Sequence, residues 1–403
     1  MPVTNGQNGT RGRGRRALMD VIRRRGPLPR IELAELTSLS RATVTTITAE
    51  LIEAGLIEEI AQAEPGNGAR RGRPRVDLRI RGAAHLVAGV KIAHRTLSLV
   101  LMDFNFSRLA ELEVPLPAPC LSADAMTDAI VGAVDTLMEK ADHCRSELSG
   151  IGLGIAGVVK AARGLVLWSP SLDARNVALG DQVSAALDLP VFVDNDANLV
   201  TMAELGFGLG RAHSDFIVVT VESGVGMGLV IDGQLYRGAG GCGAEFGHVK
   251  MHPDGPPCRC GQHGCLEAYV ADFALLREAT NLPDFDTSLP EDVQLSRLLA
   301  RAGAGGAARA ILDQARDIFA LGLANLVNIF DPRLIILAGG QVKSNPLLSA
   351  QVVEKMKEAI VQVDRPTPEV AVHQWGDRMW ALGGAAYALD GVLDLALSEM
   401  RDD

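Results

Sequence analysis

Apolar residues recur at helical spacing in three short runs within residues 16–60 of the chain. Two further apolar runs, Leu56–Ile60 and Val76–Ile80, have the length and composition of strands and are joined by a long loop. Ser40 stands where its side chain can cap the third helix, and Gly55 stands where that helix would end. Three helices followed by a two-stranded ribbon predict a winged helix-turn-helix. The apolar positions of the three helices are, in order, Leu18, Val21 and Ile22; Leu33, Leu36 and Leu39; and Val44, Ile47 and Leu51.

From about residue 84 onward, strands alternate with longer helices, which is the pattern of an α/β architecture. Two such units in series, with glycine turns after the strands, predict two lobes around a cleft. Residues 282–305 are richer in Asp, Pro, Ser, Gly and Ala and predict an exposed, partly helical excursion. The predicted strands are Leu86–Ile92, Leu97–Asp103, Ile151–Val159, Val191–Val193, Phe216–Val221, Gly226–Ile231 and Leu334–Ala338, and the predicted helices are Ala123–Lys140, Val177–Leu187 and Ala307–Val327.

These patterns set the expected domain boundaries in a chain of 403 residues, a length for which two or three domains are usual. We expect a flexible arm over 1–15, a winged helix-turn-helix over 16–80, a first α/β lobe over 84–200 completed by a C-terminal helix at 377–400, and a second α/β lobe over 201–376.

Composition excludes two classes of protein. A hydrophobic content of 47% excludes a disordered chain. No apolar run approaches the roughly 20 residues that span a bilayer, so a membrane protein is not expected. The segment Met1–Arg16 is rich in Gly and Arg and lacks the apolar stretch of a signal peptide. We therefore expect a cytoplasmic protein.

The net charge of −10 conceals an uneven distribution. Residues 1–80, which we call the head, contain 14 arginines, no lysine and nine acidic residues, a net charge of +5, so the remaining chain carries −15. A basic head on an acidic body indicates an anionic partner for the head alone. The third helix and the loop between the two strands offer arginine and short polar side chains suited to base edges and phosphates, which predicts binding to double-stranded DNA. The candidate DNA-contacting residues are Ser40, Arg41, Thr43, Thr45, Thr46, Arg71 and Arg73.

The alternative for the head is a small protein-interaction domain with a solvated basic loop. The clustering of charge and the exclusive use of arginine favour DNA.

Three cysteines lie within eight residues, at Cys258, Cys260 and Cys265, in a loop rich in Gly and Pro. Cys258 and Cys260 are too close for an easy disulfide, and a cytoplasmic chain keeps its thiols reduced. Three thiolates and one imidazole make a closed, tetrahedral and therefore structural Zn²⁺ site. The residues alone leave three candidates for the imidazole, and three unligated loop cysteines are the alternative. The candidate histidines are His248, His252 and His263.

Carboxylates and amides gather in two further places. Asn195 and Asp196 directly follow a strand, where open α/β sheets place ligand-binding residues, and Glu245, His248 and Glu267 flank the cysteine loop. Such groups converging on one cleft suit hydrogen bonding to the hydroxyls of a sugar. Each alone is explained equally well as a helix cap or a surface carboxylate.

Together these residues resemble the ROK family (repressors, open reading frames and kinases), in particular its NagC/XylR-type transcriptional regulators. The resemblance spans Arg16 to about Gly391. It rests on a C-x-C-G-x-x-G-C motif at 258–265, an E-x-G-H motif at 245–248 and an N-D-x-N motif at 195–198. It implies a two-lobed actin-like or hexokinase-like (RNase H-like) body, with His248 as the fourth zinc ligand. It also implies a sugar-contacting set of Asn195, Asp196, Glu245, His248 and Glu267.

The family contains both kinases and regulators, and two features favour a regulator. Kinases of the family lack a DNA-binding head. They also carry a D-x-G-G-T phosphate loop, where this chain reads Lys91-Ile92-Ala93-His94-Arg95, with lysine in place of the aspartate. A second phosphate motif carries Glu222, whose charge is unfavourable beside phosphate. We therefore expect no enzymatic activity, although Asp196, which resembles the catalytic base of the kinases, is retained.

The expected protein is a DNA-binding regulator, in particular a repressor of carbohydrate-utilisation genes controlled by a sugar or sugar derivative. One head contacts too few base pairs for strong specificity, so we expect a homodimer or homotetramer on a two-fold operator. The alternatives are a sugar kinase, a bifunctional kinase-regulator, or a regulator whose body binds a phosphotransfer-system protein.

Overall fold

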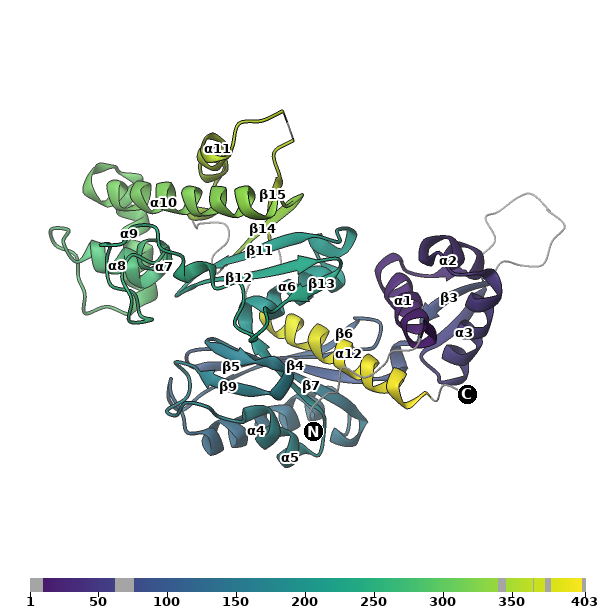
Figure 1. The fold of residues 1–403 in the computed structure, drawn as a ribbon. Coiled ribbons are helices and arrows are strands. Elements are labelled where there is room, and N and C mark those ends of the chain that lie inside the picture. Colours follow the sequence, from purple (N-terminus) through teal and green to yellow (C-terminus); the bar gives the residue numbers. More distant parts are fainter. Residues whose placement is uncertain (1–9, 62–75, 340–345, 365, 374–377, 401–403) are drawn as a thin grey trace, which may run out of the picture. The chain divides into compact units, whose positions relative to one another are not determined.

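The computed structural model describes residues 10–61, 76–339, 346–364, 366–373 and 378–400. The chain forms two compact units. The first comprises Met1–Ala212 and Trp380–Asp403, and thus contains the head, and the second comprises His213–Met379 (Figure 1).

The head is a winged helix-turn-helix with a three-stranded sheet in the order β1-β3-β2, one strand more than expected. Ser40 caps α3 by accepting a hydrogen bond from the Thr43 amide at 3.1 Å, as the sequence predicts. Gly55 follows the helix with φ +71°, a conformation that glycine adopts without strain. The elements are α1 (Thr10–Arg25), β1 (Leu28–Pro29), α2 (Arg30–Thr37), α3 (Arg41–Glu53), β2 (Ile57–Ala61) and β3 (Val76–Ile80).

The expected flexible arm over 1–15 is wrong for its last six residues, since α1 begins at Thr10. Arg15 of this helix is buried, and its charge is compensated there. Its guanidinium pairs with Glu50 of α3 at 2.9 Å and donates to the Met400 carbonyl at 3.2 Å. Residues 1–9 lie outside the described part of the chain. Residues 10–15 thus belong to a helix that contacts both α3 and the C-terminal end of the chain.

The rest of the first unit, which we call the first lobe, is built on a five-stranded sheet in the order β10-β7-β4-β5-β6. Strand β4 pairs in parallel with β7 and antiparallel with β5. Because side chains alternate along a strand, Ala88, Val90 and Ile92 join one apolar core with α4 and α5, while Val87 joins another with α12. The elements are β4 (Leu86–Ile92), β5 (Thr96–Asp103), β6 (Arg108–Pro115), α4 (Ala123–Lys140), β7 (Leu148–Ile155), β8 (Val158–Lys160), β9 (Leu165–Trp168), α5 (Leu179–Leu187), β10 (Val191–Asn195), α6 (Asp196–Phe207) and α12 (Met379–Glu399).

Helix α12 lies on the sheet with backbone touching backbone. A Cβ on Gly152 of β7 would stand 1.9 Å from the Gly384 carbonyl oxygen, and one on Gly89 of β4 would stand 2.0 Å from that of Ala381. A Cβ on Gly383 would likewise stand 2.0 Å from the Leu199 carbonyl oxygen of α6. Glycine is therefore required on both sides of this contact.

The same helix is long and apolar enough to cross a membrane by length and composition alone. The prediction that no apolar run approaches that length was therefore wrong. Since 56% of its apolar window is buried and its side chains join the core of the first unit, its apolarity is that of a core helix.

The second unit has a five-stranded sheet in the order β13-β12-β11-β14-β15, with β14 parallel to β11 and β15. Its core includes Phe319 and Leu323 of the long helix α10. The elements are β11 (Phe216–Val221), β12 (Val225–Ile231), β13 (Gln234–Tyr236), α7 (Glu267–Val270), α8 (Asp272–Ala279), α9 (Glu291–Gly303), α10 (Gly306–Phe330), β14 (Leu334–Ala338), α11 (Ala350–Ala359) and β15 (Glu369–Val372).

Three predicted details differ from the structure. The single strand predicted over Ile151–Val159 is two, because Gly157 turns the chain at φ +123°. The excursion at 282–305 contains α9, whose Leu298 is fully buried, so it is not simply exposed. The boundary at residue 200 falls inside α6, whereas the first compact unit runs to Ala212.

The glycine contact under α12 is testable by substitution. We expect Gly152→Ala to destabilise the first unit by about 1–3 kcal/mol or more, because the methyl group has no space beside the Gly384 carbonyl. Its thermal transition should fall by roughly 2–4 °C per kcal/mol. Gly132→Ala is the control, since Gly132 lies in α4 with open space around it and alanine favours helix. Equal melting temperatures for the two variants would contradict this packing.

Candidate functional site

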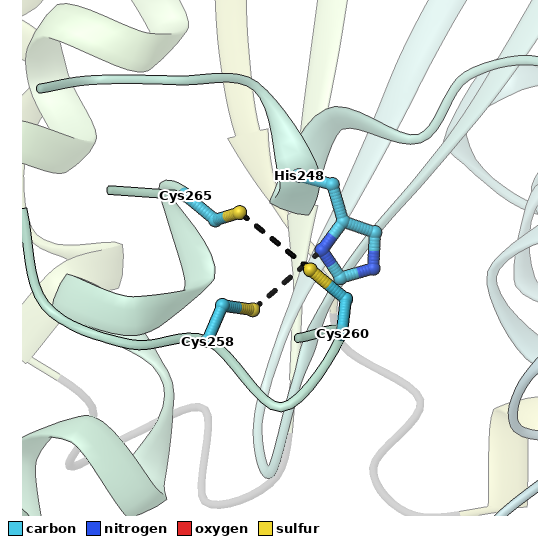
Figure 2. Close-up of side chains that lie close together, drawn as sticks. All are labelled: His248, Cys258, Cys260 and Cys265. Atoms are coloured by element: carbon cyan, nitrogen blue, oxygen red, sulfur yellow. Dashed lines mark hydrogen bonds between the residues drawn. The ribbon is translucent and has the colours of Figure 1, made fainter. Parts of the chain in front are cut away.

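One histidine and three cysteines of the second unit come together around a common point. The ligand atoms of His248, Cys258, Cys260 and Cys265 all lie within 4.8 Å of one another (Figure 2). The Sγ of Cys258 stands 3.8 Å from Nδ1 of His248, and the Sγ atoms of Cys260 and Cys265 are also 3.8 Å apart. Of the three candidate histidines, His248 is thus the one that lies with the cysteines. We call these four residues the cysteine–histidine cluster.

The loop that carries the cysteines is shaped by its glycines and backbone hydrogen bonds. Gly261 and Gly264 have φ of +87° and +67°, and a Cβ on Gly264 would stand 1.6 Å from the His252 carbonyl oxygen. The Cys258 amide donates to the Gln262 carbonyl at 2.8 Å, which closes a tight turn around the thiols. His248 reaches the same point from a short 3-10 helix, Phe246–His248.

The electrostatics of the cluster fit a site that holds a cation. Burial raises the pKa of the Cys258 thiol to about 12, so this group is neutral unless a cation stabilises its thiolate. Burial acts the same way on Cys260, but hydrogen bonds from the Gln262 amide and with the Cys258 and Cys265 thiols, together with the charge of Lys250, outweigh it, so the pKa of Cys260 is lowered. The Nζ of Lys250 lies 2.8 Å from Sγ of Cys265. Lys250 was not predicted from the sequence, where its only signal is its position two residues after His248.

The other two predicted residues of this unit differ in burial. Glu267 is buried, accepts a hydrogen bond from the Val225 amide at 3.0 Å and faces the Cys258 thiol at 3.6 Å, so its carboxylate is tied to the cluster. Glu245 precedes the 3-10 helix and is exposed.

In the first unit, Asn195 and Asp196 occupy the end of β10 and the start of α6. Asn195 caps α6, accepting from the Ala197 amide at 2.9 Å, and donates to the Gly157 carbonyl at 2.7 Å. Both ends of its amide are therefore used within the fold, as in the cap interpretation.

Asp196 forms an ion pair with Lys91 that was not predicted from the sequence. Its Oδ2 lies 2.7 Å from Nζ of Lys91, with side-chain exposures of 25% and 12%. Lys91 is on the α12 side of β4, and its Nζ also lies 5.6 Å from the ring centre of Trp380 at the start of α12. Partial burial strengthens this pairing relative to a surface ion pair.

The five residues expected to contact sugar thus belong to both units, Asn195 and Asp196 to the first and Glu245, His248 and Glu267 to the second. Within its own unit, each group has defined partners. His248 and Glu267 adjoin the cysteine–histidine cluster, and Asp196 adjoins Lys91.

The start of α3 presents the expected DNA-contacting side chains to solvent. Ser40, Arg41, Thr43, Thr45 and Thr46 are all exposed, whereas Val44, Ile47 and Leu51 of the same helix are buried. The hydroxyls of Thr45 and Thr46 donate to carbonyls one turn earlier, at 2.8 and 3.2 Å, which fixes their direction. The predicted Arg71 and Arg73 lie in 62–75, outside the described residues.

Comparison with known proteins places both parts of the chain. The ROK family model matches residues 87–390, and a winged helix-turn-helix DNA-binding model matches residues 15–58. The chain is 28% identical over 379 residues to the xylose repressor of Caldicellulosiruptor bescii, covering 91% of this chain and 92% of that one. It is 32% identical over 317 residues to the glucokinase of Streptomyces coelicolor, covering 75% and 97%.

A solved structure of similar extent has the same fold. It is a ROK family transcriptional regulator, described as a homologue of the Escherichia coli MLC protein, with a TM-score of 0.79 and 24% identity, covering 97% of this chain and 98% of that one. The glucokinase match covers only three quarters of this chain, whereas the regulator structure covers nearly all of it. The family match over 87–390 shows that the chain belongs to the ROK family and that a winged helix-turn-helix precedes its ROK domain.

Proposed function

We propose that this protein is a DNA-binding transcriptional regulator, in particular a repressor of carbohydrate-utilisation genes, whose DNA affinity responds to a sugar or sugar derivative. The observation that carries the proposal is the winged helix-turn-helix, with the exposed polar start of α3, joined to a ROK domain. The repressor relative that spans 91% of this chain supports it.

The Lys91–Asp196 ion pair supports a regulator without kinase activity. An aspartate that acts as a general base must be free to take a proton from a substrate hydroxyl. Here a lysine ammonium holds that carboxylate at 2.7 Å and brings positive charge where the resemblance implies a metal-holding aspartate. Asp196 then serves as a hydrogen-bond acceptor for a sugar hydroxyl.

The sugar-contacting set of the proposal is Asn195, Asp196, Glu245, His248 and Glu267. Aromatic residues make up only 4% of the chain, so recognition rests on carboxylates and amides rather than on ring stacking. Sugar binds the DNA-competent and DNA-incompetent states with different affinity and so shifts their populations. The regulator acts in the cytoplasm as a homodimer or homotetramer on a two-fold operator.

The metal of the cysteine–histidine cluster is Zn²⁺ in this proposal. Three thiols and one imidazole within 4.8 Å supply the donor set of a closed tetrahedral site. The metal would stabilise the thiolates, and with them the loop that carries His248 and the contact to Glu267.

A sugar kinase, alone or combined with regulation, is the second candidate function. The retained Asp196 and the similarity to a glucokinase favour it.

DNA binding is tested by Arg41→Ala with DNA from upstream of the protein's own gene. We expect the variant to bind about tenfold or more weakly, since an arginine contact to a base or phosphate contributes about 1–3 kcal/mol. A mobility-shift titration at fixed salt measures this, with Arg297→Ala, an exposed arginine of α9, as the matched control. Unchanged affinity for Arg41→Ala, or an equal loss in both variants, would count against this DNA interface.

Kinase activity is tested by coupled ATP turnover with D-glucose, D-xylose and N-acetylglucosamine. We expect no turnover above that of Asp196→Asn, because Lys91 neutralises the carboxylate. The Streptomyces coelicolor glucokinase serves as the positive control for the assay. Robust phosphorylation by the natural chain that Asp196→Asn abolishes would establish the kinase instead.

The metal assignment is tested by elemental analysis of the purified chain. We expect about one zinc per chain, lost in Cys260→Ser together with a lower melting temperature, since metal binding is coupled to folding of the loop. Cys120→Ser is the control because Cys120 is an exposed cysteine in the first lobe. A natural chain that folds without metal, or Cys260→Ser with full zinc content, would refute the assignment.

A further inference from the structure

Arg16 of helix α1 in the head forms ion pairs with the C-terminal helix α12. The Arg16 guanidinium pairs through Nη2 with Asp390 and through Nη1 with Asp394, both on α12. Its Nε lies 3.2 Å from Asp20, one turn along α1. Arg16 thus gathers three carboxylates from two helices, and its side chain is only 27% exposed.

The charges of this cluster hold the two helices together. Burial disfavours the Arg16 cation, but Asp390, Asp20 and Asp394 outweigh it, so the pKa of Arg16 is raised. Asp390 and Asp394 are four residues apart on one helix, where like charges repel each other. Arg16 compensates both, so its removal would leave α12 with uncompensated repulsion and α1 without its partner.

A second arginine joins the recognition helix to the same end of the chain. Arg15 pairs with Glu50 of α3 at 2.9 Å and donates to the Met400 carbonyl at 3.2 Å. It is 3% exposed. The contact therefore runs from α3 through α1 to the residue after α12.

The apolar core is also shared between the head and the first lobe. One continuous cluster of buried residues includes side chains of α1, of the strands β4 and β5, and of α12. The Arg23 guanidinium of α1 lies 5.3 Å from the ring centre of Phe104. The backbone carbonyl of Arg23 accepts a hydrogen bond from the Arg211 guanidinium at 2.8 Å. The head and the first lobe thus share one apolar core. Representative members of the cluster are Leu18, Met19 and Ile22; Val87, Val100 and Met102; and Ala385, Leu389 and Leu393.

The connection between head and first lobe is itself folded. After β3 the chain makes a 3-10 turn, Gly82–Ala84, and enters β4 at Leu86. The Arg81 amide donates to the Leu56 carbonyl of the head, and the Phe104 amide donates to the Gly82 carbonyl, both at 3.0 Å. A flexible linker would lack such contacts on both sides.

We propose that α12 acts as a coupling strut, with Arg16 as the positioning residue that fixes the head to the first lobe, so that head and lobe move as one body when the effector acts. The chain leaves the first unit at Ala212 and returns at Trp380, the start of α12. The helix that Arg16 holds therefore begins at one of the two points where the chain passes between the units, the other being at Ala212. This step rests on the proposed function only in its last consequence, the response to a sugar.

The proposal is tested by hydrogen exchange of the full-length chain, read peptide by peptide, without sugar or DNA. In Arg16→Ala we expect amides of α1 and of the C-terminal half of α12 to exchange about tenfold faster or more, while those of β11 in the second unit keep their rates. Arg13→Ala removes an exposed arginine from the same helix and should match the natural chain. Natural rates in α12 of the Arg16→Ala variant would overturn the proposal.

A variant on the opposite helix separates coupling from local unfolding of the head. The double variant Asp390→Asn, Asp394→Asn changes only α12, yet we expect faster exchange in α1. If α1 keeps its natural protection there, the strut is refuted, even where Arg16→Ala unfolds the head. As rescue, we expect Arg16→Glu combined with Asp390→Arg to restore most of the protection that Arg16→Glu loses.

A DNA-binding measurement then tests the consequence. With DNA from upstream of the protein's own gene and D-xylose, D-glucose or N-acetylglucosamine as probe sugars, we expect Arg16→Ala to lose most of any sugar-dependent change in affinity. Arg13→Ala should keep that change. A full sugar response in Arg16→Ala would refute the coupling. A natural chain that responds to none of the sugars would contradict the choice of effector, whereas the exchange result would still stand.

Discussion

The close packing of α12 on strands β4 and β7 is the constraint on which the first unit depends. It requires glycine at Gly89 and Gly152 of the strands and at Gly384 of the helix, where a Cβ would enter the facing backbone, while Gly383 allows the equally close contact of α12 with α6. One side of α12 is in backbone contact with the sheet, and its other sides contact α1 and the apolar cluster that the head and the first lobe share. The last helix of the chain thereby forms the support for the first one.

The same face of the sheet also decides the chemistry around Asp196. Lys91 lies two residues after Gly89 on β4 and therefore points to the same face, the α12 side, where it contacts Asp196 and lies over the ring of Trp380. A carboxylate paired with an ammonium still accepts hydrogen bonds, as the proposed contact to a sugar hydroxyl requires. The cysteine–histidine cluster, by contrast, takes its four residues from one short stretch of the second unit, between His248 and Cys265.

Periodicity predicted the elements that bury one clear face. Helix α4 has the predicted bounds Ala123–Lys140, and strand β14 has the predicted bounds Leu334–Ala338. The strands that were missed, β1, β6, β9, β13 and β15, lie at sheet edges and are only partly buried, so their apolar pattern is weak. Helix α9 was predicted to be exposed because its segment is rich in small and polar residues, although its Leu298 is buried in the core of the second unit.

The sequence by itself determined what depends on neighbouring residues: the cap that Ser40 gives α3, the split of charge between head and body, and the grouping of three thiols within eight residues. Only the tertiary structure decided which distant charges meet. Lys91 and Asp196 are 105 residues apart, and Arg16 and Asp390 are 374 apart. Local patterns follow from the backbone geometry of one helix or turn, whereas these pairs require the order of strands in the sheet and the return of α12 onto it, neither of which is encoded in any single segment.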